Sequence, residues 1–360
     1  MSSEHGGLNF RELIKAGIDP DKVIDFSVSI NPAKLPRSIQ KIINHSALYR
    51  YPDSRNMKLV EDLSAEYNIP AEEIMVVNGT SQAIFLIAAA FLGKEKTALI
   101  SGPTYSEYRD ASEIYGARVI EYSAKESNHF HPDINELKKI IETEKPDVFW
   151  ICNPNNPTGS WLDEKEINEL AAACKKVSSL MVSDEAYRCF APFGTIPETP
   201  HPDVLYLHSM TKDFCIPGLR LGWVKAPSHI IKKLLAFQPE WSVSAPAQDA
   251  GSACLNKIDY FEKSWGKTRT LTQQSSKKLE KIGLKVFPTA GNFILVKIGN
   301  AEDVKNLSVF LWKNIIQVRD CASFGLNGFI RIGTRSEKEM DMLIKLIADF
   351  IRQKGLNKEK

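Results

Sequence analysis

The sequence lacks the features that mark several classes of protein. Its 46 Lys and Arg residues nearly balance its 44 Asp and Glu residues, so no surplus of positive charge is available for nucleic acid or an anionic membrane. The longest apolar run, roughly residues 83–92, has about half the length of a membrane span. The first residues show no basic start followed by an apolar stretch, so no secretory signal is predicted. We therefore expect a cytoplasmic protein with no nucleic-acid or membrane partner.

Patterns typical of metal sites and disulfide frameworks are also missing. The six cysteines include no CxxC pair, which favours a reduced intracellular protein over a zinc site or a disulfide scaffold. No HExxH and no GxxxxGK[ST] motif occurs, so neither a metalloprotease nor a P-loop protein is supported, and no metal is expected. The composition, 43% hydrophobic and 25% charged over 360 residues, is that of a globular protein with about two domains.

The middle of the chain alternates short apolar runs with amphipathic segments. Runs that predict buried strands occupy residues 74–77, 97–100, 118–122, 147–152, 180–183 and 204–208. Segments that predict helices occupy residues 81–92, 105–115, 133–144 and 163–177. This alternation predicts an α/β fold with a mostly parallel sheet, in which ligands bind at the carboxyl ends of the strands.

The pattern changes beyond about residue 230. We expect one long helix over residues 249–282. Short strands and two helices are then predicted at residues 285–287, 292–296, 301–314, 328–332 and 336–354. These elements indicate a smaller α+β domain. The predicted boundaries give a large domain over residues 40–245, with residues 1–39 and 246–360 forming an N-terminal arm and the small domain.

Polar segments follow several of the predicted strands. VNGTSQAI at residues 77–84 opens a helix whose free N–H groups, beside Thr80 and Ser81, suit a phosphate, although either residue would equally serve as an ordinary cap. NPNNPTG at residues 153–159 predicts a rigid turn.

Two further segments carry ionisable groups. Asp184, in SDEAYRCF, is placed at a strand end, where a carboxylate can hold a ring N–H⁺ or simply cap the next helix. Lys212, in HSMTKDFCIPGLRLGW, has apolar neighbours that favour a neutral amine able to form a Schiff base, although most lysines are merely solvated. Asn156, Asp184 and Lys212 follow one another at intervals of 28 residues. A Schiff-base lysine, a carboxylate for a pyridinium nitrogen and a phosphate cup are the groups that pyridoxal phosphate requires.

Together, NPNNPTG, SDEAY, SMTK and GLRLGW resemble the motifs of fold type I pyridoxal-phosphate enzymes of the aspartate aminotransferase superfamily, over essentially the whole chain. The resemblance implies a large domain with a mostly parallel seven-stranded sheet that includes one antiparallel strand. It further implies a smaller α+β domain, a pyridoxal 5′-phosphate cofactor and a homodimer. Tyr51, in YRYPD, would reach the cofactor phosphate of the neighbouring subunit.

The same resemblance assigns roles to the other motif residues. Lys212 would bind the cofactor covalently and move the proton at the substrate α-carbon. Asp184 would keep the pyridine nitrogen protonated, Tyr187 and Asn156 would hydrogen-bond the ring hydroxyl, and Tyr105 would stack on the ring. Lys212, Asp184 and Tyr187 would be the catalytic residues. The cofactor phosphate would be held by Gly79, Thr80, Ser81, Ser209, Thr211 and Arg220.

Two branches of the superfamily share these motifs, the histidinol-phosphate aminotransferases and the threonine-phosphate decarboxylases of cobamide biosynthesis. The segments HGG, DFSVSINP, FQPEWSVSAPAQDAG and VRDCASFGLNGFIRIGTR resemble the decarboxylases, with departures at Asp320 and Ser323. The residues that would bind substrate are His5, Gly6, Gly7, Asn31, Asn156, Arg319 and Arg331. Arginine forks suit phosphate, so a phosphorylated amino acid agrees with this set.

The resemblance favours decarboxylation of L-threonine O-3-phosphate to (R)-1-aminopropan-2-yl phosphate. L-Serine O-phosphate, which would give ethanolamine phosphate, differs by one methyl group, and one methyl changes binding by only about 1–3 kcal/mol. Histidinol-phosphate aminotransferase is the main alternative. A pyridoxal-phosphate-binding transcription regulator is disfavoured because the chain has no basic patch for nucleic acid.

Overall fold

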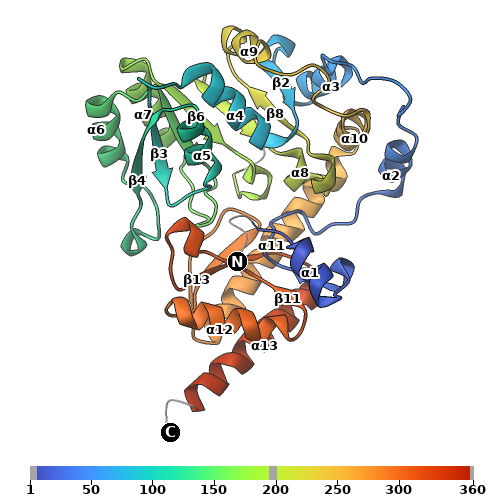
Figure 1. Cartoon of the computed structure of the whole chain (residues 1–360), viewed down its shortest axis with the longest axis vertical. Coiled ribbons are helices and arrows are strands. Elements are labelled where there is room, and N and C mark those ends of the chain that lie inside the picture. The colour runs from blue at the N-terminus through green and yellow to red at the C-terminus, as the bar shows by residue number, and fades with distance from the viewer. Residues whose placement is uncertain (1–5, 194–200, 357–360) are drawn as a thin grey trace.

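The buried strands of the middle of the chain form one seven-stranded sheet in a computed structural model that describes residues 6–193 and 201–356 (Figure 1). Its order is β2-β8-β7-β6-β5-β3-β4. The strands are β2 (Ile74–Val77), β3 (Thr97–Gly102), β4 (Arg118–Ser123), β5 (Val148–Cys152), β6 (Leu180–Asp184), β7 (Val204–His208) and β8 (Gly222–Lys225). Only β8 runs antiparallel to its neighbours, so the predicted mostly parallel sheet is confirmed.

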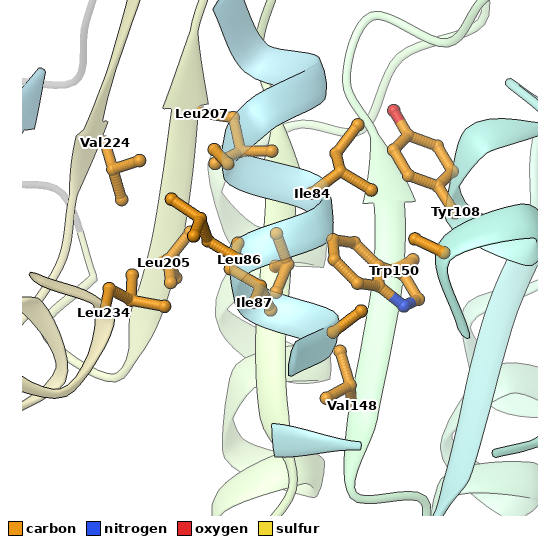
Figure 2. Packing of buried hydrophobic residues seen from close by; sticks show 14 of the residues in the cluster. Ile84, Leu86, Ile87, Tyr108, Val148, Trp150, Leu205, Leu207, Val224 and Leu234 are labelled. Atoms are coloured by element: carbon orange, nitrogen blue, oxygen red, sulfur yellow. The ribbon is translucent and has the colours of Figure 1, made fainter. Parts of the chain in front are cut away.

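Helices cover both faces of this sheet, which explains why its strands are continuously apolar. They are α4 (Gly79–Phe91), α5 (Glu107–Ile114), α6 (Ile134–Glu144), α7 (Glu164–Lys176) and α9 (Ser228–Leu235). Alternate strand residues face opposite sides. Ile100 packs in the cluster that contains α4, α5 and α9, whereas Leu99 packs in the cluster that contains α6 and α7. Figure 2 shows the first cluster, in which Tyr108 stacks on Trp150 with ring centroids 5.4 Å apart.

The second part of the molecule is a four-stranded antiparallel sheet with two helices. The strands are β9 (Lys285–Val286), β10 (Phe293–Lys297), β12 (Arg319–Asp320) and β13 (Phe329–Gly333), in the order β12-β13-β10-β9. The helices are α12 (Ala301–Trp312) and α13 (Glu337–Leu356). Near the N-terminus, β1 (Ile24–Asp25) pairs in parallel with β11 (Ile316–Gln317), so this early strand belongs with the second part.

The predicted single helix over residues 249–282 is wrong. It is two helices, α10 (Ala245–Leu255) and α11 (Ile258–Lys281), because the backbone leaves the helical conformation at Lys257, which has φ −130° and ψ 31°. α10 packs on α2 (Arg37–Asn44) and α3 (Met57–Tyr67).

The long helix α11 connects the two parts (Figure 1). Its residues Phe261 and Trp265 share a buried cluster with Leu59 of α3, whereas Leu279 packs in the cluster of the small sheet. Residues 245–265 therefore pack with the large part, beyond the boundary predicted after residue 245.

The remaining elements are short. Helices α1 (Phe10–Ala16) and α8 (Met210–Asp213) accompany 3₁₀ turns at Pro20–Lys22, Ala71–Glu73, Glu126–Asn128, Arg188–Phe190, Pro217–Leu219 and Ala322–Phe324. Within residues 6–193 and 201–356, no helix combines the length and the apolar character needed to cross a membrane.

Replacing Trp150 by alanine should destabilise the large part strongly. The indole is 0% exposed and lies between α4, α5 and the sheet, so its removal leaves a cavity that costs about 3–5 kcal/mol. Urea unfolding followed by circular dichroism measures the loss. The matched control is Trp312→Ala, whose side chain is 37% exposed and which should cost about 1 kcal/mol or less. Equal losses in the two variants would contradict this account of the core.

Candidate active site

A cavity of about 150 Å³ lies where the carboxyl ends of β5, β6 and β7 meet the small part of the molecule. The polar and charged residues at its wall come from elements far apart in the sequence. Of the residues predicted to form the site, those lining the cavity are Gly6, Thr80, Ser81, Tyr105, Asn156, Asp184, Tyr187, Ser209, Thr211, Lys212, Arg220, Arg319 and Arg331. The fold thus gathers most of the predicted site in one place.

Lys212 lies on the single turn of α8, directly after β7. Its Nζ is 5.9 Å from the centroid of the Tyr187 ring. Burial lowers the pKa of Lys212 to about 8, and the nearby positive charges of Arg331 and Arg220 act in the same direction. A substantial fraction of the amine is therefore neutral near pH 8, which is the form that attacks a carbonyl carbon.

Asp184 ends β6 and is 3% exposed. Its Oδ2 accepts a hydrogen bond from the Tyr108 hydroxyl at 2.7 Å, and its Oδ1 accepts one from the backbone N–H of Ala186 at 3.0 Å. Burial raises the pKa of Asp184 to about 6, while these hydrogen bonds and the charge of Lys212 favour its ionised form. These two hydrogen bonds hold the carboxylate in a fixed position, where it can accept a further hydrogen bond from a protonated ring nitrogen.

The start of α4 provides a site for a phosphate group. The side chain of Asn78, the N-cap residue, accepts no hydrogen bond from the first N–H groups of the described helix. These N–H groups can therefore bind a ligand. Gly79 has φ +72°, and a Cβ atom there would lie 2.8 Å from Nη2 of Arg220. The absence of a side chain at Gly79 therefore permits a close approach between the helix start and the Arg220 guanidinium. Two hydroxyl groups, those of Ser209 and Thr211, lie 2.7 Å apart and are close in sequence to Lys212.

Three further predicted residues line the same cavity. The Tyr105 ring is edge-on to Tyr108, with centroids 5.7 Å apart. Tyr187 is buried against Phe293, with ring centroids 5.0 Å apart, and burial raises the pKa of the Tyr187 hydroxyl to about 12. The side-chain oxygen of Asn156 accepts a hydrogen bond from Arg331. The two tyrosines therefore stay protonated and can donate hydrogen bonds near neutral pH.

Arg319 and Arg331 face each other at one end of the cavity. They are directly paired in register on the antiparallel strands β12 and β13, and each is 5% exposed. Arg319 donates to Ser323 Oγ at 2.7 Å, and Arg331 donates to the backbone oxygen of Ser27 at 2.6 Å. Burial, followed by the charge of Arg331, lowers the pKa of Arg319. Two guanidinium groups side by side give this end of the cavity a positive potential, which favours an anionic ligand.

Some predicted site residues lie elsewhere. Asn31 is buried away from the cavity, where its side-chain nitrogen donates to the Asp213 backbone and to Ser264 Oγ. Gly7 lines a neighbouring cavity of about 710 Å³ instead. Tyr51 is 76% exposed, and its ring stacks on that of Trp241 with ring centroids 4.6 Å apart. His5 lies outside the described residues.

The structure adds lining residues that the sequence did not indicate. Tyr108, Cys152, Ser27 and Ser29 all reach the cavity. Tyr108 occurs in a segment whose periodicity predicts only a packed helix, so nothing in the sequence pattern announces its hydrogen bond to Asp184.

Comparison with known proteins agrees with this geometry. The family model for aminotransferase class I and II matches residues 21–347. The chain is 30% identical to threonine-phosphate decarboxylase from Salmonella typhimurium, over 98% of this chain and 97% of that protein. It is 32% identical to the adenosylcobalamin biosynthesis bifunctional protein CobDQ from Leptospira interrogans over 96% of this chain, but spans only 41% of that longer relative. It is 29% identical to histidinol-phosphate aminotransferase from Ruminiclostridium cellulolyticum, over 88% of this chain and 90% of that protein.

Solved structures give the same fold. L-threonine-O-3-phosphate decarboxylase from Porphyromonas gingivalis superposes with a TM-score of 0.80 at 26% identity, covering 92% of this chain and all of that chain. Histidinol-phosphate aminotransferase from Sinorhizobium meliloti, in complex with pyridoxal-5′-phosphate, superposes with a TM-score of 0.86 at 22% identity, covering 96% of this chain and 95% of that chain. The second likeness concerns the fold alone.

The lining residues fit pyridoxal 5′-phosphate, which is the cofactor. The uncapped start of α4, the paired hydroxyls of Ser209 and Thr211, and Arg220 match a phosphate. Asp184 would suit a protonated pyridine nitrogen, and Lys212 would suit as the amine of a Schiff base.

Replacing Tyr108 by phenylalanine should weaken cofactor binding more at pH 6 than at pH 8. The lost hydroxyl stabilises the ionised form of Asp184, so the pKa of this carboxyl should rise above about 6. A rise of about one unit, about 1.4 kcal/mol, reduces the ionised fraction about fivefold at pH 6 and hardly at all at pH 8. Titration of the apoenzyme with pyridoxal phosphate, followed by absorbance, measures both affinities.

The control for this experiment is Tyr122→Phe. The Tyr122 hydroxyl accepts a hydrogen bond from the backbone N–H of Asp133 at 2.8 Å, and its ring packs on the other face of the sheet. Loss of this hydroxyl should therefore leave cofactor affinity unchanged at both pH values. A Tyr108→Phe variant whose loss is equal at pH 6 and pH 8 would show that the hydroxyl does not govern the ionisation of Asp184.

Proposed function

The chain belongs to the aminotransferase class I and II family of pyridoxal-phosphate enzymes, and from this premise we propose that it decarboxylates L-threonine O-3-phosphate to (R)-1-aminopropan-2-yl phosphate. This product would serve as the linker of the nucleotide loop in cobamide biosynthesis. The proposal is supported by the similarity to a threonine-phosphate decarboxylase over nearly the full length of both chains, and to a protein of adenosylcobalamin biosynthesis. L-Serine O-phosphate is included as a second candidate substrate because it lacks only one methyl group.

The main physical support is the buried pair Arg319 and Arg331. A phosphorylated amino acid carries a carboxylate and a phosphate, and guanidinium groups bind both in a bidentate manner. The cavity is lined by four cationic side chains, those of Lys212, Arg220, Arg319 and Arg331. Asp184 is the one carboxylate among the described lining residues, so the site favours ligands of high negative charge. One phosphate belongs to the cofactor, and we assign Arg319 and Arg331 to the substrate.

The reaction breaks the bond between the α-carbon and the carboxylate, releases CO₂ and places a proton on the α-carbon. When bound, pyridoxal phosphate supplies an electron sink for the electron pair left at that carbon. Lys212, with its lowered pKa, can hold the proton and deliver it to the α-carbon. Arg319 and Arg331 orient the substrate, and this orientation decides whether the carboxylate or the hydrogen leaves the α-carbon.

We also propose that the site is completed in a homodimer. Tyr51 and Trp241 form an exposed aromatic pair at 76% and 49% exposure, and Leu48 and Tyr49, close by in sequence, are exposed as well; neighbouring exposed apolar side chains are typical of a protein–protein contact. Tyr51 would then reach the cofactor phosphate of a second copy of the chain.

Product analysis tests the proposed reaction. Purified holoenzyme is incubated separately with L-threonine O-phosphate and L-serine O-phosphate, with no keto-acid acceptor, and CO₂ and the amine phosphate are followed. We expect catalytic CO₂ release, and the ratio of the two rates identifies the preferred substrate. The alternative, histidinol-phosphate aminotransferase, predicts no CO₂ and conversion of histidinol phosphate once 2-oxoglutarate is added.

Replacing Arg331 by alanine should raise KM for the phosphorylated amino acid about 30-fold or more, because a buried partner of an anion is lost. Cofactor affinity should change far less, since Arg331 is paired with Arg319 on the small sheet, whereas the groups that match the cofactor phosphate lie at the start of α4 and on Arg220. Arg335→Ala is the control, because Arg335 pairs with Glu339 outside the cavity. Equal losses of substrate and cofactor binding in Arg331→Ala would contradict the assignment.

A further inference from the structure

Phe293 is a buried aromatic residue that connects the two ends of the candidate site. It lies on β10, is 0% exposed, and is not among the described residues that line the cavity. Its ring contacts Tyr187, with ring centroids 5.0 Å apart, and the guanidinium of Arg331, whose Cζ lies 5.4 Å from the ring centroid. Tyr187 belongs to the large part of the molecule and Arg331 to the small part, so this one side chain spans the junction between them.

The register of the small sheet explains why Phe293 and Arg331 meet. Phe293 pairs with Gly333, and Leu295 pairs with Arg331, across the antiparallel strands β10 and β13. Because side chains two residues apart on a strand point to the same face, Phe293 and Arg331 are diagonal neighbours on one face of the sheet. Gly333, directly opposite Phe293, has no side chain that could separate the ring from the guanidinium.

The Phe293 ring has little freedom to move. A Cβ atom built on Gly291 would lie only 2.6 Å from the ring, so the backbone of this loop packs directly against it. The Tyr187 ring meets it edge to face, with 79° between the ring planes. Ala186 belongs to the same small cluster of buried apolar residues. The position of the ring is therefore set by the loop before β10 and by the turn after β6.

The Arg331 guanidinium is held partly by this ring. Its two terminal nitrogens donate to Asn156 Oδ1 and to the carbonyl oxygen of Ser27, whereas its Nε has no hydrogen-bond partner within residues 6–193 and 201–356. The face of an aromatic ring attracts a guanidinium, and the attraction is stronger when both groups are removed from water. Arg331 is 5% exposed and Phe293 is fully buried, so their contact lies in such an environment.

Phe293 could instead serve only to fill space in the core. An aliphatic side chain of similar size would then replace it with little effect on the site. Without a ring, however, that side chain could neither attract the guanidinium nor meet Tyr187 edge to face. The aliphatic substitution therefore separates a packing role from a role in the site.

We propose that Phe293 is a positioning residue that acts through Arg331, because its ring fixes the guanidinium relative to Tyr187. It thereby sets the separation between the anion-binding end of the cavity and the cofactor end. This inference rests on the proposed function for the role of Arg331 in binding a phosphorylated substrate. It does not depend on which bond at the α-carbon breaks.

The test compares Phe293→Leu with Phe287→Leu in the holoenzyme. Phe287 is also in the small part and is 1% exposed, and it is not among the described residues that line the cavity. Its ring packs against Phe130 and Phe329, with centroids 5.2 and 5.7 Å away, and it also faces a cation, Lys285, whose Nζ is 5.1 Å from the centroid. It therefore matches Phe293 in burial and in type of contact.

We expect the two variants to lose similar thermal stability. Only Phe293→Leu should raise KM for L-threonine O-phosphate and L-serine O-phosphate, by about tenfold or more, because the guanidinium loses its buried aromatic contact. The affinity for pyridoxal phosphate should change far less in both variants. A wild-type KM in Phe293→Leu with normal cofactor absorbance, or an equal rise in Phe287→Leu, would overturn the inference.

A double-mutant cycle tests whether Phe293 acts through Arg331. Introduced into Arg331→Ala, the Phe293→Leu change should raise KM by no more than about twofold further, because the group that the ring positions is already absent. Equal fold-increases with and without Arg331 would show that Phe293 acts by another route and would overturn the inference. If Phe293→Leu folds poorly, Phe293→Met fills more of the space without restoring a ring and should show the same rise in KM.

This inference and the proposed reaction can fail separately. If the wild-type enzyme releases no CO₂ and instead transaminates histidinol phosphate, the same variants are measured with histidinol phosphate. A raised KM in Phe293→Leu, but not in Phe287→Leu, would then still support the positioning role. If Arg331→Ala keeps the wild-type KM for every phosphorylated substrate, the assignment of Arg331 to the substrate is wrong, and the positioning role of Phe293 is overturned with it.

Discussion

Positive charge held out of water is the constraint on which the rest of the site depends. Lys212, Arg319 and Arg331 line one small cavity, and Asp184 is the one carboxylate that the described lining brings to them. Burial lowers the pKa of Lys212 and of Arg319, because removal from water disfavours the charged form of each group. Such an arrangement favours the binding of anionic ligands. The cofactor carries such a charge on its phosphate, and the substrate that we propose would carry another.

The fold satisfies this constraint by building the cavity from two parts. The large sheet presents Asp184 and Lys212 after parallel strands, whose carboxyl ends meet at one edge. The small sheet presents Arg319 and Arg331 on paired strands. The segment around Ser29 joins the two, because it is bonded to the Lys212 carbonyl through Asn31 and to the small part through Ser27. A change in the packing of either part would therefore alter the site.

This division also separates two tasks. Residues from the large part fit the cofactor, whereas the two arginines lie where the substrate is proposed to bind. Relatives that share the fold but differ in name, decarboxylase in one case and aminotransferase in the other, are consistent with a common cofactor site and a variable substrate end.

The sequence by itself determined the strand and helix alternation, the cofactor and the approximate place of Lys212 and Asp184, because these depend on local periodicity and on short motifs at strand ends. Only the tertiary structure decided which neighbours face the cavity. Asn31 and Ser29 are two residues apart in one motif, yet the first is an internal anchor and the second lines the cavity. Tyr108 likewise reaches Asp184 across a distance of 76 residues in the chain. Such assignments depend on contacts between distant segments, which no local pattern encodes.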